Sequence, residues 1–215
     1  MRHYISVLIT AILLSLCLLP APSRAQTTPQ ATPPQQGASQ ELQATLDSIL
    51  NVLLDPRLRD DQHKTQRMGK VSHLFRQRFA ERIFCERALG RYWNERTKPQ
   101  QEEFVLLFTT LLVDTYLERI DGYLSANKNF SQKNITYLGE RSAKAYTLVT
   151  TDVKLDQTKT IPVLYRMEKI NGDWKVTDIA LEGISLLKNY RAQFNEIIAN
   201  AGYEELLKRL QAKQV

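Results

Sequence analysis

The chain has 215 residues, of which 43% are hydrophobic and 24% charged, and its formal net charge is +6 at pH 7. This composition is typical of a globular protein, and the modest positive charge, without a dense Lys/Arg block, argues against nucleic-acid binding. The sequence contains eight glycines, but they form no phosphate-binding loop and no dinucleotide fingerprint, which argues against a nucleotide-dependent enzyme.

Residues 1–25 have the pattern of a secretory signal peptide. Arg2 and His3 give a positive start, an apolar run covers residues 5–19, and Ser23-Arg24-Ala25 is a small-x-small cleavage site. Cleavage after Ala25 would leave 190 residues and lower the net charge to +4. The run is shorter than the ~20 residues that span a bilayer. We therefore expect an exported, soluble protein.

Two other interpretations of this N-terminal region are weaker. The apolar run could act as a membrane anchor, although its length argues against this. Cys17 could be a lipidation site, but Leu16 precedes it, where a lipidation motif has a small residue.

Residues 26–39 are rich in Gln, Pro, Thr and Ala and have almost no large apolar side chains. Such a composition cannot bury enough surface to fold, and it predicts a disordered leader. Residues 40–215 then form a single domain, long enough for a substantial core. Cys85 is the one cysteine left after cleavage, which excludes an intramolecular disulfide. Its apolar neighbours Ile83 and Phe84 predict a buried thiol rather than intermolecular pairing.

The first half of the domain has helical periodicity. Ser39 can cap a helix that Asp55-Pro56 ends, and further helices are expected over residues 60–80 and 81–93. Thr97 and Gln100 form a capping box for a long helix over residues 100–124. That helix is apolar nearly all round, so it is either buried on two sides or faces an apolar ligand on one.

After residue 130 the apolar residues recur with a period of two, as in strands. Strands are expected from Ile135 to Leu138, from 145 to 155, around 161–167, and from 173 to 181 after an Asn171-Gly172 hairpin turn. Helices over residues 186–200 and 202–210 complete the chain. The fold class is therefore α+β, a curved four-stranded antiparallel sheet covered by N- and C-terminal helices around an apolar cavity.

Two groups of motifs resemble the MlaC family of periplasmic phospholipid-transfer proteins, also called toluene-tolerance auxiliary proteins. The first is Leu89-Gly90-Arg91-Tyr92-Trp93, followed by Thr97-x-x-Gln100-x-x-x-Phe104. The second is a Gly-x-Trp-x-Val-x-Asp strand starting at Gly172, a Glu-Gly-x-Ser-Leu turn starting at Glu182, and an Asn-Tyr-Arg-x-x-Phe helix starting at Asn189. The matching stretches run, with gaps, from about Leu42 to Leu210.

The resemblance implies a soluble periplasmic carrier, exported by its signal peptide and needing no cofactor. Such proteins shuttle glycerophospholipid between an outer-membrane lipoprotein–porin complex and the lipid-binding ring subunit of an inner-membrane ABC transporter, which maintains outer-membrane lipid asymmetry. A monomer that binds no nucleic acid is expected. A hopanoid is a second possible ligand, because a hopanoid-associated subgroup has a similar sequence.

The apolar faces of the expected strands and helices supply candidate lipid-binding residues. Each is also a good core residue. They are Leu111, Tyr116, Tyr146, Leu148, Val163, Tyr165, Met167, Trp174, Val176, Ile184 and Leu187. Lys188 and Arg191 lie near the N-terminus of the expected helix over residues 186–200, where the helix dipole disfavours cations and favours anions. They are candidates for contact with a lipid headgroup or an acidic partner, or else form a solvated cationic face.

Catalysis has little support in the sequence. His63 and His73 are not at metal-ligand spacing with a cysteine or carboxylate, and there is no Gly-x-Ser-x-Gly elbow. Asp178 and Glu182 could form a carboxylate pair, as in isomerases on similar folds, although Glu182 is better explained as part of the Gly183 turn. We expect no enzyme. A protein-binding adaptor without lipid, or a small-molecule isomerase, remains the alternative.

Overall fold

The computed structural model describes residues 37–215, which belong to one compact unit. The predicted signal peptide and nearly all of the predicted leader lie outside the described residues. The first helix begins at Ala38 with Gly37 as its N-cap, and Ser39 is already helical. The predicted domain boundary at residue 40 is thus two residues late, and Ser39 is not the cap.

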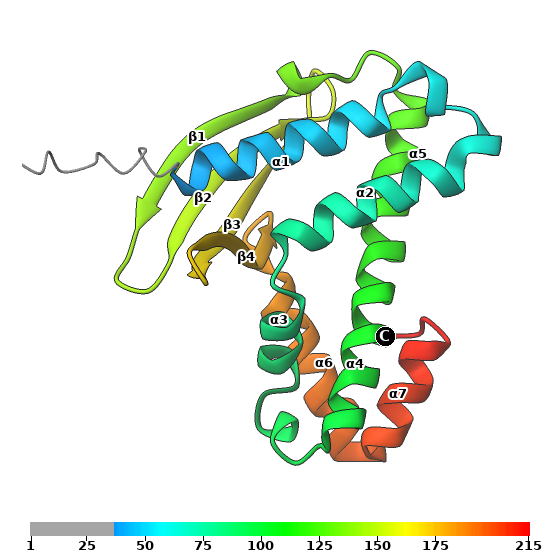
Figure 1. The fold of residues 1–215 in the computed structure, drawn as a ribbon, viewed down its shortest axis with the longest axis vertical. Helices are drawn as coiled ribbons and strands as arrows, with labels where there is room; N and C mark the ends of the chain where they lie inside the picture. Colours follow the sequence, from blue (N-terminus) through cyan, green and yellow to red (C-terminus); the bar gives the residue numbers. More distant parts are fainter. Residues whose placement is uncertain (1–36) are drawn as a thin grey trace, which may run out of the picture. The chain divides into compact units, whose positions relative to one another are not determined.

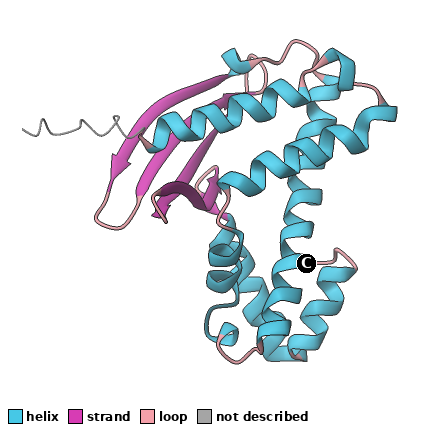
Figure 2. Cartoon of the chain, in the orientation of Figure 1, coloured by secondary structure: helices cyan, strands magenta, loops and turns pink. Residues whose placement is uncertain are grey.

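Helices and strands follow the order expected from the periodicity. The α-helices are α1 Ala38–Leu53, α2 Lys64–Arg78, α3 Glu81–Leu89, α4 Lys98–Leu112, α5 Glu118–Ala126, α6 Leu186–Ala201 and α7 Tyr203–Gln211. The strands are β1 Ile135–Ser142, β2 Thr147–Lys154, β3 Thr160–Ile170, β4 Asp173–Leu181 and β5 Ile184–Ser185. Figure 2 shows how these helices and strands are distributed in the fold.

The sheet is an antiparallel meander in the order β1-β2-β3-β4-β5. Asn171 and Gly172, at φ 54° and 92°, close the predicted hairpin between β3 and β4. The prediction of four strands was one short, because the chain after Gly183 turns back and pairs Ser185 with Ala180 and Ile184 with Leu181. This two-residue strand is too brief to leave a period in the sequence.

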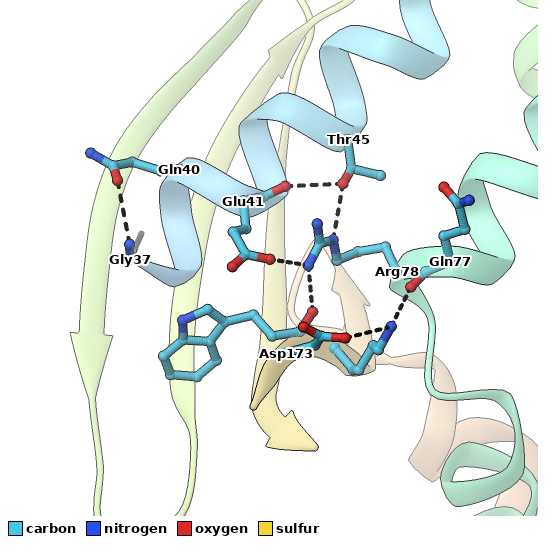
Figure 3. A network of polar contacts seen from close by, with 9 residues as sticks. Gly37, Gln40, Glu41, Thr45, Gln77, Arg78 and Asp173 are labelled. Carbon is cyan, nitrogen blue, oxygen red and sulfur yellow. Dashed lines mark hydrogen bonds and ion pairs between the residues drawn. The ribbon is translucent and has the colours of Figure 1, made fainter. Parts of the chain in front are cut away.

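Helix α1 lies over one face of the sheet, and α2 lies beside α1 with its C-terminal end at β4 (Figure 1). Arg78, the last residue of α2, joins three elements there. Its guanidinium contacts the Glu41 carboxylate and donates to Thr45 Oγ1 on α1 at 2.9 Å and to the Trp174 carbonyl on β4 at 2.6 Å. Figure 3 shows this network, in which Lys175 also donates to the Gln77 carbonyl at 2.6 Å. The layers are therefore held together by polar contacts as well as by apolar packing.

Helices α3, α4, α6 and α7 pack together as a bundle at the other end of the described unit (Figure 1). Its interior is aromatic: the ring of Phe108 lies 4.8 Å from Phe194, 4.9 Å from Tyr190 and 5.7 Å from Phe84, centroid to centroid. These distances are within the range of favourable aromatic pairing. The bundle and the buried face of the sheet share one hydrophobic core.

The predicted long helix is real but not uniform. The Thr97–Gln100 capping box starts α4, as expected. A π-helical turn, Val113–Leu117, then separates α4 from α5. A π-turn widens the helix and shifts the faces on either side of it relative to each other. Within residues 37–215, we find no helix with the length and apolar character that crossing a bilayer requires.

Candidate functional site

The buried face of the sheet forms one wall of the candidate site. Strand register sets which side chains share it: Thr147 lies opposite Met167, and Val149 opposite Tyr165. On β4, Val176 pairs with Met167. Because side chains alternate along a strand, these residues point to the same side, and Met167 and Val149 are fully buried. Val163, Tyr165 and Met167 therefore share one face of β3, and Val176 of β4 lies on the same face.

Helices supply the opposite wall. Leu111 from α4 is buried in the same core cluster as Val163, Tyr165, Met167 and Val176. The partly buried side chains Tyr116 from the π-turn, Leu187 from α6 and Trp174 from β4 pack against that cluster. The structure therefore brings most of the predicted lining residues together in one apolar region, although they come from distant parts of the sequence.

Three predicted lining residues do not lie there. Tyr146 and Leu148 point to the other face of the sheet: Leu148 lies opposite Arg166, and the Arg166 guanidinium stacks on the Tyr146 ring at 3.9 Å from its centroid. Ile184 in β5 is 63% exposed. The prediction chose the wrong parity on β2, because both sets of alternating side chains there are similarly apolar and only the pairing with β3 distinguishes them.

The predicted set lacked several residues on the buried face of the sheet. Val149, Thr151 and Tyr137 lie on this face, with Tyr137 of β1 directly opposite Thr151 of β2. The period-two pattern did place Val149 and Thr151 on a common side of their strand. What could have found them is the length of the β2–β3 turn, which sets the hairpin register and so pairs Val149 with Tyr165.

The buried wall carries hydroxyl groups but few charges. The Tyr137 hydroxyl and Thr151 Oγ1 are buried without a hydrogen-bond partner among the described residues. The Tyr165 hydroxyl lies near Thr151 without the geometry of a hydrogen bond, and burial raises its pKa. The pKa of Tyr137 is raised mainly by burial, and further by the Asp47 carboxylate of α1 and by Tyr165. These phenols stay neutral at any physiological pH.

The N-terminus of α6 is occupied by the protein's own side chains. Ser185 accepts from the Lys188 N–H at 3.1 Å, and Asp178 accepts from the Leu187 N–H at 3.1 Å and from the Ser185 hydroxyl at 2.6 Å. Since the Asp178 carboxylate sits where an anion would bind, this helix end does not offer its N–H groups to a phosphate. Asp178 therefore caps the N-terminus of α6.

Lys188 and Arg191 are both exposed on α6. The Arg191 guanidinium lies over Gly90, where α3 ends: a Cβ atom on Gly90 would be 3.0 Å from an Arg191 Nη atom. The sequence motif around Gly90 and the helix motif around Arg191 therefore meet in space. Arg191 is in this way partly a packing residue, and its charged group remains at the surface.

A charged cluster covers part of the outer face of the sheet. Glu168 on β3 accepts from Arg87 of α3 at 2.7 and 2.8 Å, from Arg166 at 2.9 Å and from the Thr177 hydroxyl at 2.9 Å. The pKa of Glu168 is lowered to about 2. The hydrogen bonds from Arg87 are the largest cause, and those from Arg166 and Thr177 add to it. This cluster joins the helical bundle to the sheet.

Two surface hollows lie away from the predicted wall. One of about 570 Å³ lies between α1 and α2, lined by Val52, Thr65, Gln66, Gly69, Lys70, His73 and Leu74. The other, about 390 Å³, lies where α5 leads into β1 and is lined by Ala126, Asn127, Lys128, Asn129, Phe130, Asn134 and Leu155. Neither contains a predicted lining residue. The wall residues instead pack against one another, so the apolar region is closed in this conformation.

The described residues contain no group of three or more His, Cys, Asp or Glu side chains placed to hold a metal ion. His63 pairs with Asp60 at 2.6 Å near the start of α2, and His73 contacts Gln77 at 2.9 Å on its exposed face. Cys85 is fully buried, as expected, and desolvation raises its pKa to about 12. A thiol held neutral in this way is a poor nucleophile.

Comparison with known proteins agrees with the fold and with the motifs. Among solved structures, the phospholipid-binding protein from Ralstonia solanacearum, determined in complex with a phospholipid, is 26% identical and superposes with a TM-score of 0.71 over 83% of this chain and 97% of the other. Curated protein sequences give no significant match. The family model described as MlaC protein matches residues 43–212. This match covers most of the chain, both motif groups and every element that builds the apolar wall, and the chain therefore belongs to the MlaC family.

Proposed function

We propose that this protein binds a glycerophospholipid and carries it through the periplasm, between an outer-membrane lipoprotein–porin complex and the lipid-binding ring of an inner-membrane ABC transporter. The observation that carries the proposal is the similarity, over nearly the whole domain, to a structure that holds a phospholipid. Membership of the MlaC family supports the same proposal. The protein would act as a monomer without a cofactor and perform no chemistry on its ligand.

Physical chemistry sets what such a carrier must offer. Removing a phospholipid from a bilayer exposes two acyl chains, at about 0.8 kcal/mol per CH₂, or on the order of 20 kcal/mol for ~16-carbon chains. A binding region must return most of this free energy by being apolar and free of unpaired charge. The cluster around Leu111, Val163, Met167 and Val176 has that character.

The same cluster is packed shut, so loading needs the sheet and the helices that cover it to separate. Separation would expose apolar surface on both layers, and the acyl chains would cover it again. The lipid then replaces side-chain contacts with chain contacts, which lets a small domain hold a large ligand without a permanent cavity. Met167 suits this exchange because its thioether side chain adapts to different neighbours.

Native mass spectrometry of protein purified from a Gram-negative host without detergent tests the proposal. We expect a major species with one phospholipid bound per chain, since an apolar ligand of this size dissociates slowly into water. Protein that arrives only in the apo form, and that takes up no lipid from vesicles of phosphatidylethanolamine and phosphatidylglycerol, would contradict it. A bound lipid without a phosphate would instead favour a carrier of another lipid, such as a hopanoid.

Adjacent residues of β3 provide a matched pair of variants. Val163 is on the buried face and Leu164 on the outer face of the same strand. We expect Val163→Gln to lose most of the bound lipid, because the amide would meet acyl chains without a hydrogen-bond partner. Leu164→Gln should keep it. Circular dichroism checks that both variants fold; equal lipid content in two folded variants would remove the buried face from the binding site.

A further inference from the structure

The apolar wall contains two hydroxyl groups whose presence its packing does not explain. Thr151 is fully buried and its Oγ1 has no hydrogen-bond partner among the described residues, and the same holds for the Tyr137 hydroxyl. A buried polar group without a partner is unfavourable, and valine and phenylalanine would fill nearly the same space without that cost. Two such groups on one surface call for a common partner.

The two residues are neighbours across the sheet. Tyr137 on β1 and Thr151 on β2 form a directly opposite pair, and Val163 of β3 lies next to Thr151 on its other side. Both hydroxyls therefore belong to the surface that we assign to the lipid. Tyr165, whose hydroxyl lies near Thr151 and which is 8% exposed, extends this polar strip along the wall.

The surroundings limit the charge of the partner. The Asp47 carboxylate of α1 contributes, after burial, to the raised pKa of Tyr137, so negative charge is already present near this hydroxyl. The buried arginine of the described residues, Arg67, is already paired with Asp121. An anion such as the lipid phosphate would thus meet a carboxylate and no available buried cation. An uncharged acceptor fits better, since neutral hydroxyls donate to it without desolvating a charge.

We infer that Tyr137 and Thr151 donate hydrogen bonds to an ester carbonyl of the bound diacyl phospholipid. This inference rests on the proposed function and adds a polar contact to it. The ester groups are the uncharged acceptors that lie between the acyl chains and the phosphate. Hydroxyls in an otherwise apolar wall would hold the lipid at a fixed depth, while the chains themselves can slide along apolar side chains.

Lipids that differ only at this linkage test the inference. The protein is incubated with vesicles containing equal amounts of a diester and a diether phosphatidylcholine, both with saturated 16-carbon chains, and the bound ratio is read by native mass spectrometry. A hydrogen bond between neutral groups predicts a preference of about threefold to tenfold for the diester in the wild type. The Tyr137→Phe/Thr151→Val double variant should bring the ratio close to one.

Thr109 on α4 provides the matched control. It is also fully buried with an unpartnered hydroxyl, but it lies beside Cys85 of α3 and not on the sheet. Thr109→Val should keep the wild-type diester preference. Thermal unfolding checks that all variants stay folded, which is expected because the changes remove only unpartnered polar atoms.

The outcomes separate the two proposals. Equal uptake of both lipids by the wild type, or an unchanged preference in the double variant, would overturn the hydroxyl–ester contact and leave the carrier function standing. Uptake of neither lipid by the wild type would overturn both. A ratio that falls in Thr109→Val as much as in the double variant would assign the effect to general core packing and so also overturn the contact.

Discussion

At the scale of single residues, the polar side chains inside this protein fall into two kinds. Glu168, Arg67 and Asp178 have hydrogen-bond partners, and those of Glu168 and Arg67 join elements that are distant in sequence. Tyr137 and Thr151 have none. Paired charges stabilise a particular arrangement of layers, whereas unpaired hydroxyls in an apolar wall are consistent with a ligand that supplies the partner.

The hydrogen bonds around Glu168 make the free energy of unfolding depend on pH in the acid range. The Glu168 carboxylate has a pKa of about 2 in the folded protein, below the ordinary value of 4.5. The stabilisation is therefore fully present above about pH 4.5 and is lost as pH falls towards 2, because the unfolded state binds the proton first. Glu168→Gln should flatten this part of the pH profile of the urea midpoint.

At neutral pH the free energy of unfolding of the same variant should be about 1 kcal/mol lower, a value typical of partly exposed ion pairs in a network. Glu102→Gln, which breaks the exposed Arg82–Glu102 pair, is the control and should change little between pH 2 and 7. An unchanged acid profile in Glu168→Gln would show that other carboxylates cause the acid sensitivity.

At the scale of elements, the turns and interruptions between helices determine how the walls are placed. The π-turn Val113–Leu117 changes the orientation of α5 relative to α4 and carries Tyr116, which packs against the core cluster. Gly90 ends α3 at φ 58° and ψ −125°, and the Arg191 guanidinium of α6 packs over it. Both features set the angle at which a helix leaves the bundle.

Gly90 should tolerate no side chain. Gly90→Ala would hold an L-residue in a disfavoured backbone conformation and place its Cβ 3.0 Å from the Arg191 guanidinium. We expect a loss of about 1–3 kcal/mol in the free energy of unfolding by urea. Gly69→Ala, in the middle of α2 with no atom within 4 Å of the added Cβ, should instead stabilise by up to about 1 kcal/mol. A harmless Gly90→Ala would contradict this account of the turn.

At the scale of the whole described unit, two sets of contacts hold the layers around the apolar region. Arg78 joins α1, α2 and β4 at one edge. Arg67 of α2 and Asp121 of α5 form a buried pair, with Nε–Oδ1 at 2.6 Å and Nη2–Oδ2 at 2.8 Å. If the sheet and the helices separate to admit lipid, we expect these contacts to stay intact and the movement to occur at other parts of the unit, because breaking a buried ion pair is strongly unfavourable.

Asp121→Asn should reveal how strongly α2 and α5 are joined. It leaves the Arg67 guanidinium buried, at 2% exposure, without its counter-charge. We expect a loss of about 3–5 kcal/mol in unfolding free energy. The Arg67→Met/Asp121→Leu double variant should recover much of it, since an apolar pair leaves no unpaired charge. A double variant as unstable as the single one would mean that packing volume, not charge, is the dominant effect.

Local signals predicted the individual elements well. The capping box at Thr97 and Gln100 and the Asn171-Gly172 turn are both formed as predicted. Each depends on residues within a few positions of one another. The errors arose on the side of β2 that faces the helices, which depends on pairing with β3, and at the strand β5, whose two residues are too few to show a period.

The family, the α+β class, the order of helices and strands and the apolar character of the region they enclose could all be predicted from the chain, because sequence motifs, periodicity and turn chemistry are local properties. The three-dimensional fold was needed to show that Tyr146 and Leu148 lie outside that region, that Tyr137 and Thr151 lie within it, and that its walls are closed on each other. The physical reason is that strand register and helix packing depend on many weak contacts between segments far apart in sequence, and a shift of one residue turns a side chain from one face of the sheet to the other.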